Sequence, residues 1–183
     1  FPTRRSSDLD NNLTTLDLFA YNLSTGVQSL ITHAVNSLTT TPSAGNSVLY
    51  LGSTLDGQYA FFRASDISQF GVAGAAFTDN NTTNSDIVSY NLATGAHRLV
   101  THNGELGEMA AANSSSIYRG LTSDGKYLIL TSSSASVHGR AGVAFTDQSA
   151  NGGDTDVIAY NIATGEHSLV SHNSAAGNMA AGT

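Results

Sequence analysis

One loop of the chain carries oxygen side chains at alternate positions, which is how calcium-binding loops present their ligands. Asp147, Ser149 and Asn151 are followed by Gly152, which permits the sharp turn that such a loop needs. The match is partial, because Ile158 holds the twelfth position, where calcium loops place a bidentate glutamate. We favour a surface loop closed by Asx turns and keep calcium as the alternative. Calcium is the only cofactor that the sequence suggests, and its candidate ligands are Asp147, Ser149, Asn151, Asp154 and Asp156.

The six histidines are the other residues that could do chemistry. Five of them occupy two equivalent positions of a sequence repeat: the first position holds His33, His102 and His172, and the second holds Gln28, His97 and His167. Such recurrence indicates structural roles. A strand sends His97 and His102 to opposite faces, so these two rings cannot chelate one ion. The chain also lacks a nucleophile elbow, a zinc-binding helix motif and a phosphate-binding loop, so we expect no catalytic residue and no enzyme activity in it.

The repeat itself organises the chain. The stretch 86–102, DIVSYNLATGAHRLVTH, recurs as 17–33 and 156–172, and the leading aspartates lie 86 − 17 = 69 and 156 − 86 = 70 residues apart. A fixed period of this kind is typical of propellers and arrays. Each copy holds two short apolar runs joined by Ser-Thr-Gly or Ala-Thr-Gly, where glycine supplies the positive φ of a tight turn. Each copy is therefore predicted to form a β-hairpin.

A second predicted hairpin lies between successive copies. Apolar runs flank Asp56-Gly57 and Asp124-Gly125, and Asp-Gly between such runs is a strong hairpin signal. The two aspartates are 124 − 56 = 68 residues apart, so this hairpin keeps the period, and we expect both aspartates to hold their turns through their own backbone. Residues 47–102 and 116–172 are thus predicted to form two equivalent sheets of four antiparallel strands, with strand order following the chain.

Both hairpins resemble a known repeat. The run from Ser123-Asp124-Gly125-Lys126 to Ser132, together with the stretch 156–171, resembles the TolB-like, WD40-like β-propeller repeat of bacteria. The resemblance covers almost everything after Leu16, with mild departures such as Leu55 before Asp-Gly. It implies an all-β fold in which four-stranded antiparallel blades surround a central channel. Two blades and one hairpin cannot close a ring, so we expect an open fragment of a β-propeller whose remaining blades are missing.

The repeat also predicts how the chain is divided. Residues 1–9 resemble a translated sequencing adapter and are set aside; 10–46 hold the outer hairpin of a truncated blade and a linker, 47–115 a full blade and a linker, and 116–183 a second full blade and the start of the next linker. A fragment that lacks a neighbour on each side should expose apolar residues there. We expect the residues Leu18, Phe19 and Tyr21 on one side, and Val157, Ile158 and Tyr160 on the other, to include side chains more exposed than Ile87, Val88 and Tyr90.

Composition and resemblance together limit the function classes. The formal net charge is −7 and the seven lysines and arginines are scattered singly, so we expect no nucleic-acid partner. No apolar segment approaches 18 residues, so we expect no membrane span. The chain has no cysteine, which excludes disulfides and thiolate metal sites.

The resemblance implies a non-enzymatic scaffold or binding segment of a larger bacterial protein that is periplasmic, cell-surface or secreted. Its partner is expected to be a protein or a glycan. Two alternatives stay open. In one, the propeller is accessory to a catalytic domain outside this chain, a peptidase or a glycan-acting enzyme. In the other, the chain is a calcium-stabilised adhesin-like module.

Overall fold

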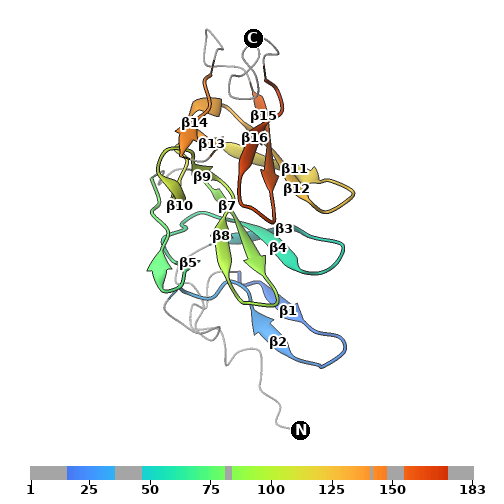
Figure 1. The fold of residues 1–183 in the computed structure, drawn as a ribbon. Helices are drawn as coiled ribbons and strands as arrows, with labels where there is room; N and C mark the ends of the chain where they lie inside the picture. Colours follow the sequence, from blue (N-terminus) through green and yellow to red (C-terminus); the bar gives the residue numbers. More distant parts are fainter. Residues whose placement is uncertain (1–15, 36–46, 81–83, 141, 148–154, 173–183) are drawn as a thin grey trace.

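Figure 1 shows the computed structural model, which describes residues 16–35, 47–80, 84–140, 142–147 and 155–172. The adapter-like residues 1–9 lie outside this part of the chain. Within it the regular structure is β, with one short 3-10 helix, η2 (Ala135–Val137), so the predicted all-β class is confirmed. None of the described helical structure has the length and apolarity of a membrane span.

The strands are β1 (Phe19–Tyr21), β2 (Gln28–Leu30), β3 (Val48–Ser53), β4 (Tyr59–Ala64), β5 (Gly71–Val72), β6 (Ala75–Ala76), β7 (Asp86–Asn91), β8 (His97–Leu99), β9 (His102–Asn103), β10 (Gly107–Ala111), β11 (Ser116–Leu121), β12 (Tyr127–Ser132), β13 (Gly139–Arg140), β14 (Val143–Ala144), β15 (Asp156–Asn161) and β16 (His167–Leu169).

Two four-stranded antiparallel sheets form the body of the structure. The first sheet has the order β3-β4-β7-β8 and the second the order β11-β12-β15-β16, so strand order follows the chain in both, as predicted. Even their irregularities agree, because the register shifts between Tyr50 and Gly52 in the first sheet and between Tyr118 and Gly120 in the second. The hairpin β1–β2 precedes them, and in Figure 1 the hairpin and the two sheets lie one above another.

The turns are held by short polar side chains, and two of these, Asp56 and Asp124, were predicted from the sequence. Asp56 accepts hydrogen bonds from the Thr54 hydroxyl at 2.6 Å and from the Gln58 amide at 3.0 Å. Asp124 repeats the arrangement with Thr122 at 2.7 Å and the Lys126 amide at 3.1 Å. The prediction that both aspartates serve their own turns is therefore confirmed. In the outer hairpins, the side-chain oxygens of Asn22, Asn91 and Asn161 each accept from the two backbone amides that begin the turn.

Three small two-stranded sheets, β5–β6, β9–β10 and β13–β14, lie in segments that the sequence analysis treated as loop or linker. Most of their strands have two residues, too few to show a hydrophobic period. Two of these sheets depend on glycine. A side chain at Gly71 would collide with the backbone carbonyl of Ala75, and one at Gly139 would collide with that of Val143.

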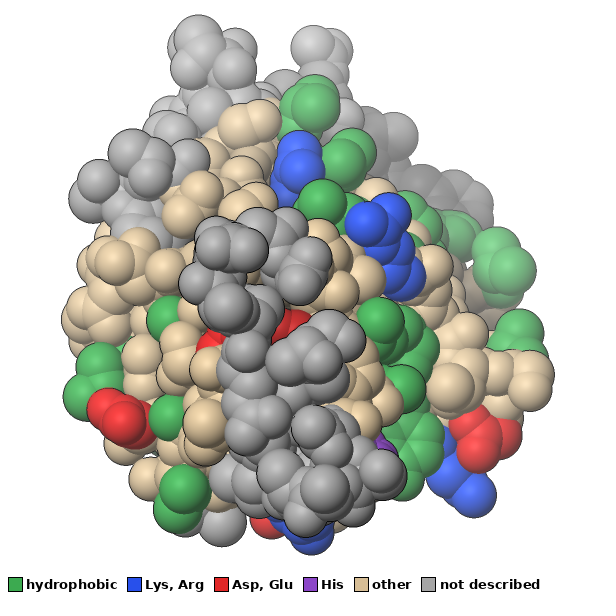
Figure 2. Space-filling model, turned by 90° about the horizontal axis from the view of Figure 1, so that it is seen from above, with side chains coloured by type: hydrophobic (Ala, Val, Ile, Leu, Met, Phe, Trp, Pro, Cys, Tyr) green, Lys and Arg blue, Asp and Glu red, His purple; other side chains and the backbone are tan. Residues whose placement is uncertain are grey.

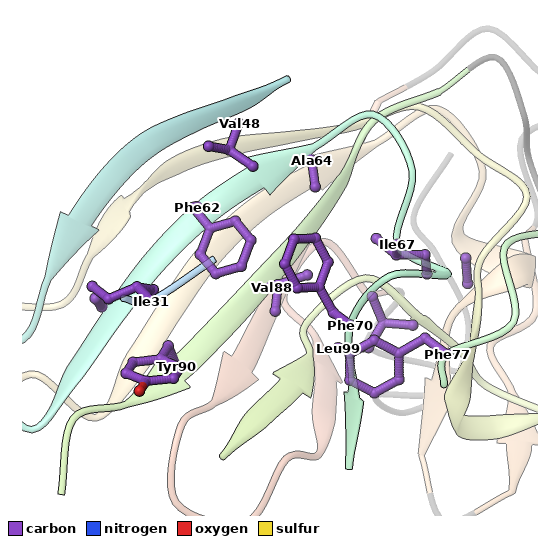
Figure 3. Packing of buried hydrophobic residues seen from close by; sticks show 12 residues of the cluster. Ile31, Val48, Phe62, Ala64, Ile67, Phe70, Phe77, Val88, Tyr90 and Leu99 are labelled. Carbon is purple, nitrogen blue, oxygen red and sulfur yellow. The ribbon is translucent and has the colours of Figure 1, made fainter. Parts of the chain in front are cut away.

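Side chains alternate along each strand, which gives every sheet two distinct faces. Val88 and Tyr90 point into a first core between the hairpin β1–β2 and the first sheet, whereas Ile87 points into a second core between the two sheets. We call the face of a sheet that points toward the preceding element, here the face with Val88 and Tyr90, its front face. The opposite face, here the face with Ile87, is its back face. Figure 3 shows Ile31 from the first hairpin beside Phe62 and Tyr90 of the first sheet. Each front face thus packs on the back face of the preceding element.

The two ends of the stack are more open than its middle, in part as expected. Tyr21 is 62% exposed where its counterpart Tyr90 is 2% exposed, and Val157 is half-buried where Ile87 is fully buried. Ile158 and Tyr160, by contrast, are buried, because they lie on the front face of the second sheet and pack against the first sheet. The open side of the second sheet is its back face.

Candidate functional site: the histidines between the sheets

His97 and His167 join each sheet to the element before it. His97 begins β8 opposite Tyr90, and its Nε2 lies 2.8 Å from the backbone carbonyl oxygen of Ile31 in the first hairpin. His167 begins β16, and its Nε2 lies 2.8 Å from the carbonyl oxygen of Val100 in the first sheet. A carbonyl oxygen only accepts, so both rings carry their proton on Nε2 and donate it across the interface.

His33 and His102, at the other repeated histidine position, lie against the rings of His97 and His167. The rings of His33 and His97 have centroids 4.6 Å apart, and those of His102 and His167 stack at 4.1 Å. Tyr90 meets His33 edge-on, and Tyr160 meets His102 in the same way. Both inter-sheet contacts therefore repeat one pattern of rings. His97 faces the first core and His102 faces the second sheet, so the two rings are separated. The prediction that they share one strand was wrong, because β8 ends at Leu99 and His102 begins β9.

Each pair of histidine rings has a third ring beside it, which is His138 next to His167 and Phe70 next to His97. His138 lies with its ring 5.1 Å from that of His167, and its Nε2 approaches the hydroxyls of Ser132 at 3.1 Å and Ser116 at 3.2 Å. The Ser132 hydroxyl donates to the Ser134 carbonyl, so His138 donates to Ser132. In the first group the equivalent ring is Phe70, 5.2 Å from His97. A phenyl ring in that place indicates packing rather than ligation.

Burial keeps these histidines neutral. Desolvation lowers the pKa of His97 to about 4 and that of His138 to about 3, and it holds the pKa of His167 well below its ordinary value. Neutral imidazoles can bind metal, but His97 and His167 use Nε2 as donors to carbonyls. In the part of the chain that the structure describes, no group of three or more His, Cys, Asp or Glu side chains is placed to hold a metal ion.

The calcium alternative concerns another part of the second sheet. Ser149, Asn151 and Asp154 lie outside the described residues. Asp147 is half-buried, and Asp156 is buried and accepts a hydrogen bond of 2.8 Å from the hydroxyl of Ser171. Asp156 therefore has a structural partner of its own, and the calcium site stays a prediction.

The bond to Asp156 belongs to a repeated clamp that the sequence analysis missed. At the start of each outer hairpin a hydroxyl donates to the leading aspartate and accepts from the amide that follows this aspartate. Thr101 does so with Asp86 at 2.6 Å and with the Ile87 amide at 3.1 Å. The other two clamps pair Asp17 with Thr32 and Asp156 with Ser171. The signal was present in the sequence, since a Thr or Ser stands 15 residues after each leading aspartate.

One further contact between the sheets has no repeated counterpart. Arg98 forms an ion pair with Glu108 at 2.9 Å and donates to the backbone carbonyls of Ala163 at 3.3 Å and Thr164 at 3.0 Å. These carbonyls belong to the turn between β15 and β16, so the guanidinium ties the first sheet to the second. Copies one and three carry Ser29 and Ser168 at this position, and the repeat therefore gives no hint of the role of Arg98.

Two features of the described surface are open to solvent. A groove of about 370 Å³ lies between the Asp-Gly turns of the two sheets, and its lining combines polar side chains such as Gln58 and Lys126 with the apolar Tyr59 and Ile162. The edge strands β3 and β11 expose Leu49, Tyr50 and Ile117, each about half accessible. No family model, curated protein or solved structure matches the chain. The function is therefore argued from these contacts and surfaces.

Proposed function

We propose that the chain is a non-enzymatic segment of a bacterial β-propeller that acts as a scaffold and binding face of a larger exported or cell-surface protein. The observation that carries the proposal is the front-to-back packing, made twice with the same residue positions. Blades of a propeller pack on one another in this way, with each unit contacting only its neighbours. The strand order also agrees with a propeller blade, in which the first strand lies innermost.

The binding face of the proposed propeller is its channel side. In a ring of such sheets, β3 and β11 would border the central channel, and these strands expose Leu49, Tyr50 and Ile117. Aromatic side chains such as Tyr50 are frequent anchors of protein partners. The groove between the Asp-Gly turns suits a glycan instead, because amide, carboxylate and ammonium groups for hydrogen bonding stand there beside the aromatic ring of Tyr59.

A structure of the uninterrupted gene product tests the proposal. We expect a closed ring of four-stranded sheets that includes residues 47–172, with β3 and β11 facing the channel. An open stack in which these strands face outward would contradict it. Assays of the same product with peptide and glycan substrates separate the non-enzymatic proposal from its alternative. Hydrolysis that persists in the isolated 183-residue chain would contradict the absence of catalytic residues.

A further inference from the structure

The two ends of the stack carry complementary halves of one contact. On the front face of the hairpin β1–β2, Tyr21 and Gln28 are cross-strand partners, in the same register as Tyr90 with His97 and Tyr160 with His167. The latter two pairs make the internal contacts described above. Tyr21 and Gln28 are exposed, whereas Leu30, on the same face, is buried, so the open part of this face is the end of the hairpin next to its turn. The hairpin thus presents an unused pair at the positions that join one sheet to the next.

The back face of the second sheet presents the receiving half. Val170 and His172 stand at the positions of Val100 and His102, which receive His167 and Tyr160 inside the chain. Val170 is 53% exposed where Val100 is fully buried, and His172 is exposed. Seen from above, this end of the molecule shows hydrophobic side chains at several places on its described part (Figure 2).

We propose that a second copy of the chain covers this back face with its front face, so that copies associate head to tail. The Gln28 carboxamide Nε2–H takes the place of the imidazole Nε2–H and donates to the Val170 carbonyl of the other copy. Tyr21 lies against His172, as Tyr90 lies against His33 and Tyr160 against His102. A second copy is the occupant that the chain itself supplies, because both halves of the contact are present on it.

The types of the four residues in the proposed contact, Tyr21 and Gln28 on one copy and Val170 and His172 on the other, favour association. Gln28 and Val170 carry no ionisable side chain, so the hydrogen bond between them desolvates no ion. The contact joins two different surfaces and is heterologous, so each pair leaves one front face and one back face open. The proposed contact copies the packing observed within the chain. In the proposed propeller these two faces would pack on neighbouring blades, so the inference concerns the association of the 183-residue chain.

Two variants on opposite ends test the proposal by sedimentation. We expect the wild-type 183-residue chain to associate as its concentration rises. Tyr21→Asp on the front face and Val170→Asp on the back face should each raise the dissociation constant about 30-fold or more, because each places a carboxylate in the centre of the contact. An equimolar mixture of the two variants should form a one-to-one pair, because the Val170→Asp chain keeps a sound front face and the Tyr21→Asp chain a sound back face.

The matched control is Leu55→Asp, which makes the same kind of change at an exposed leucine in the turn between β3 and β4, on neither face. It should associate like the wild type, and circular dichroism melts should show that all three variants fold. A wild-type chain that stays monomeric at about 100 µM, a concentration at which weak interfaces assemble, overturns the proposal. So does a single variant that still associates, which would indicate a symmetric or nonspecific contact, or a mixture that stays monomeric.

Discussion

The Nε2 of His167 lies 2.8 Å from the carbonyl oxygen of Val100, and this bond joins the two sheets. His97 stands in the same relation to Ile31 at the preceding interface. The donor in each case is a ring that can gain a second proton. Burial opposes that proton, so the contact between sheets depends on histidines that must stay neutral.

Stability should therefore fall as the pH is lowered below the ordinary histidine value. The pKa of His97 is lowered by burial to about 4 and that of His138 to about 3, while the unfolded chain binds these protons near pH 6.5. Between these values the unfolded state binds more protons than the folded state, so protonation favours unfolding. We expect a loss of about 2 kcal/mol for each such histidine at pH 5 relative to pH 8, measured by urea unfolding.

The substitution His138→Phe measures how much one histidine contributes to the loss of unfolding free energy between pH 8 and pH 5. Phenylalanine already stands at the equivalent position as Phe70, but in His138→Phe the buried Ser116 hydroxyl loses its bond to His138. We therefore expect the variant to lose about 1–3 kcal/mol at pH 8. Between pH 8 and pH 5 the variant should lose about 2 kcal/mol less than the wild type, because its unfolded chain has one proton fewer to gain. An unchanged pH dependence would show that His138 titrates in the folded protein.

Calcium should leave the stability of the chain unchanged. We favour the loop closed by Asx turns, and Asp156, one of the candidate ligands, is engaged with Ser171. Melting temperatures in millimolar calcium and in excess chelator should therefore agree. A bound ion at about 100 times its dissociation constant would instead add about 2.7 kcal/mol, which the melt would show clearly. If calcium stabilises the wild type, Asp147→Asn should abolish that gain.

Close packing of backbone around Gly71 predicts a large effect of a small substitution. A methyl group there would meet the Ala75 carbonyl and the side chain of Val35, so we expect Gly71→Ala to cost at least about 2 kcal/mol of unfolding free energy. Gly57 is the matched control, since its φ is +68° and no atom lies within 4 Å of the added methyl. Gly57→Ala should cost about 1 kcal/mol, from backbone strain alone. Equal costs in denaturant unfolding would contradict the crowding at Gly71.

Those parts of the fold that depend on neighbouring residues were predictable from the sequence. The Asp-Gly turns, the glycine turns of the outer hairpins and the order of strands all follow from local turn chemistry and from a period that recurs. The two-residue strands were not predictable, because Gly71 and Gly139 are set by contacts with carbonyls four residues away, and two residues cannot show an alternating pattern.

The site between the sheets was predictable only in outline. The recurrence of His97 and His102 indicated structural roles, and their rings do face different neighbours, although the two residues lie in separate strands, β8 and β9. Their acceptors and stacking partners lie more than 60 residues away in the chain, at distances that a local pattern does not report. His138 was hidden because its counterpart is Phe70, and Arg98 because its counterparts are serines.

The hydroxyl clamps provide the last prediction. Thr101 is fully buried, donates to Asp86 at 2.6 Å and accepts from the Ile87 amide at 3.1 Å. Thr101→Val keeps the shape of the side chain and removes both bonds, one of them to a buried carboxylate. We expect a loss of about 3 kcal/mol in denaturant unfolding, since hydrogen bonds to buried charged groups are among the strongest. Thr101→Ser is the matched control, because Ser171 already fills this position of the repeat, and it should cost no more than about 1 kcal/mol. If the valine variant is as stable as the serine variant, the hydroxyl contributes nothing and the clamp is incidental to the hairpin.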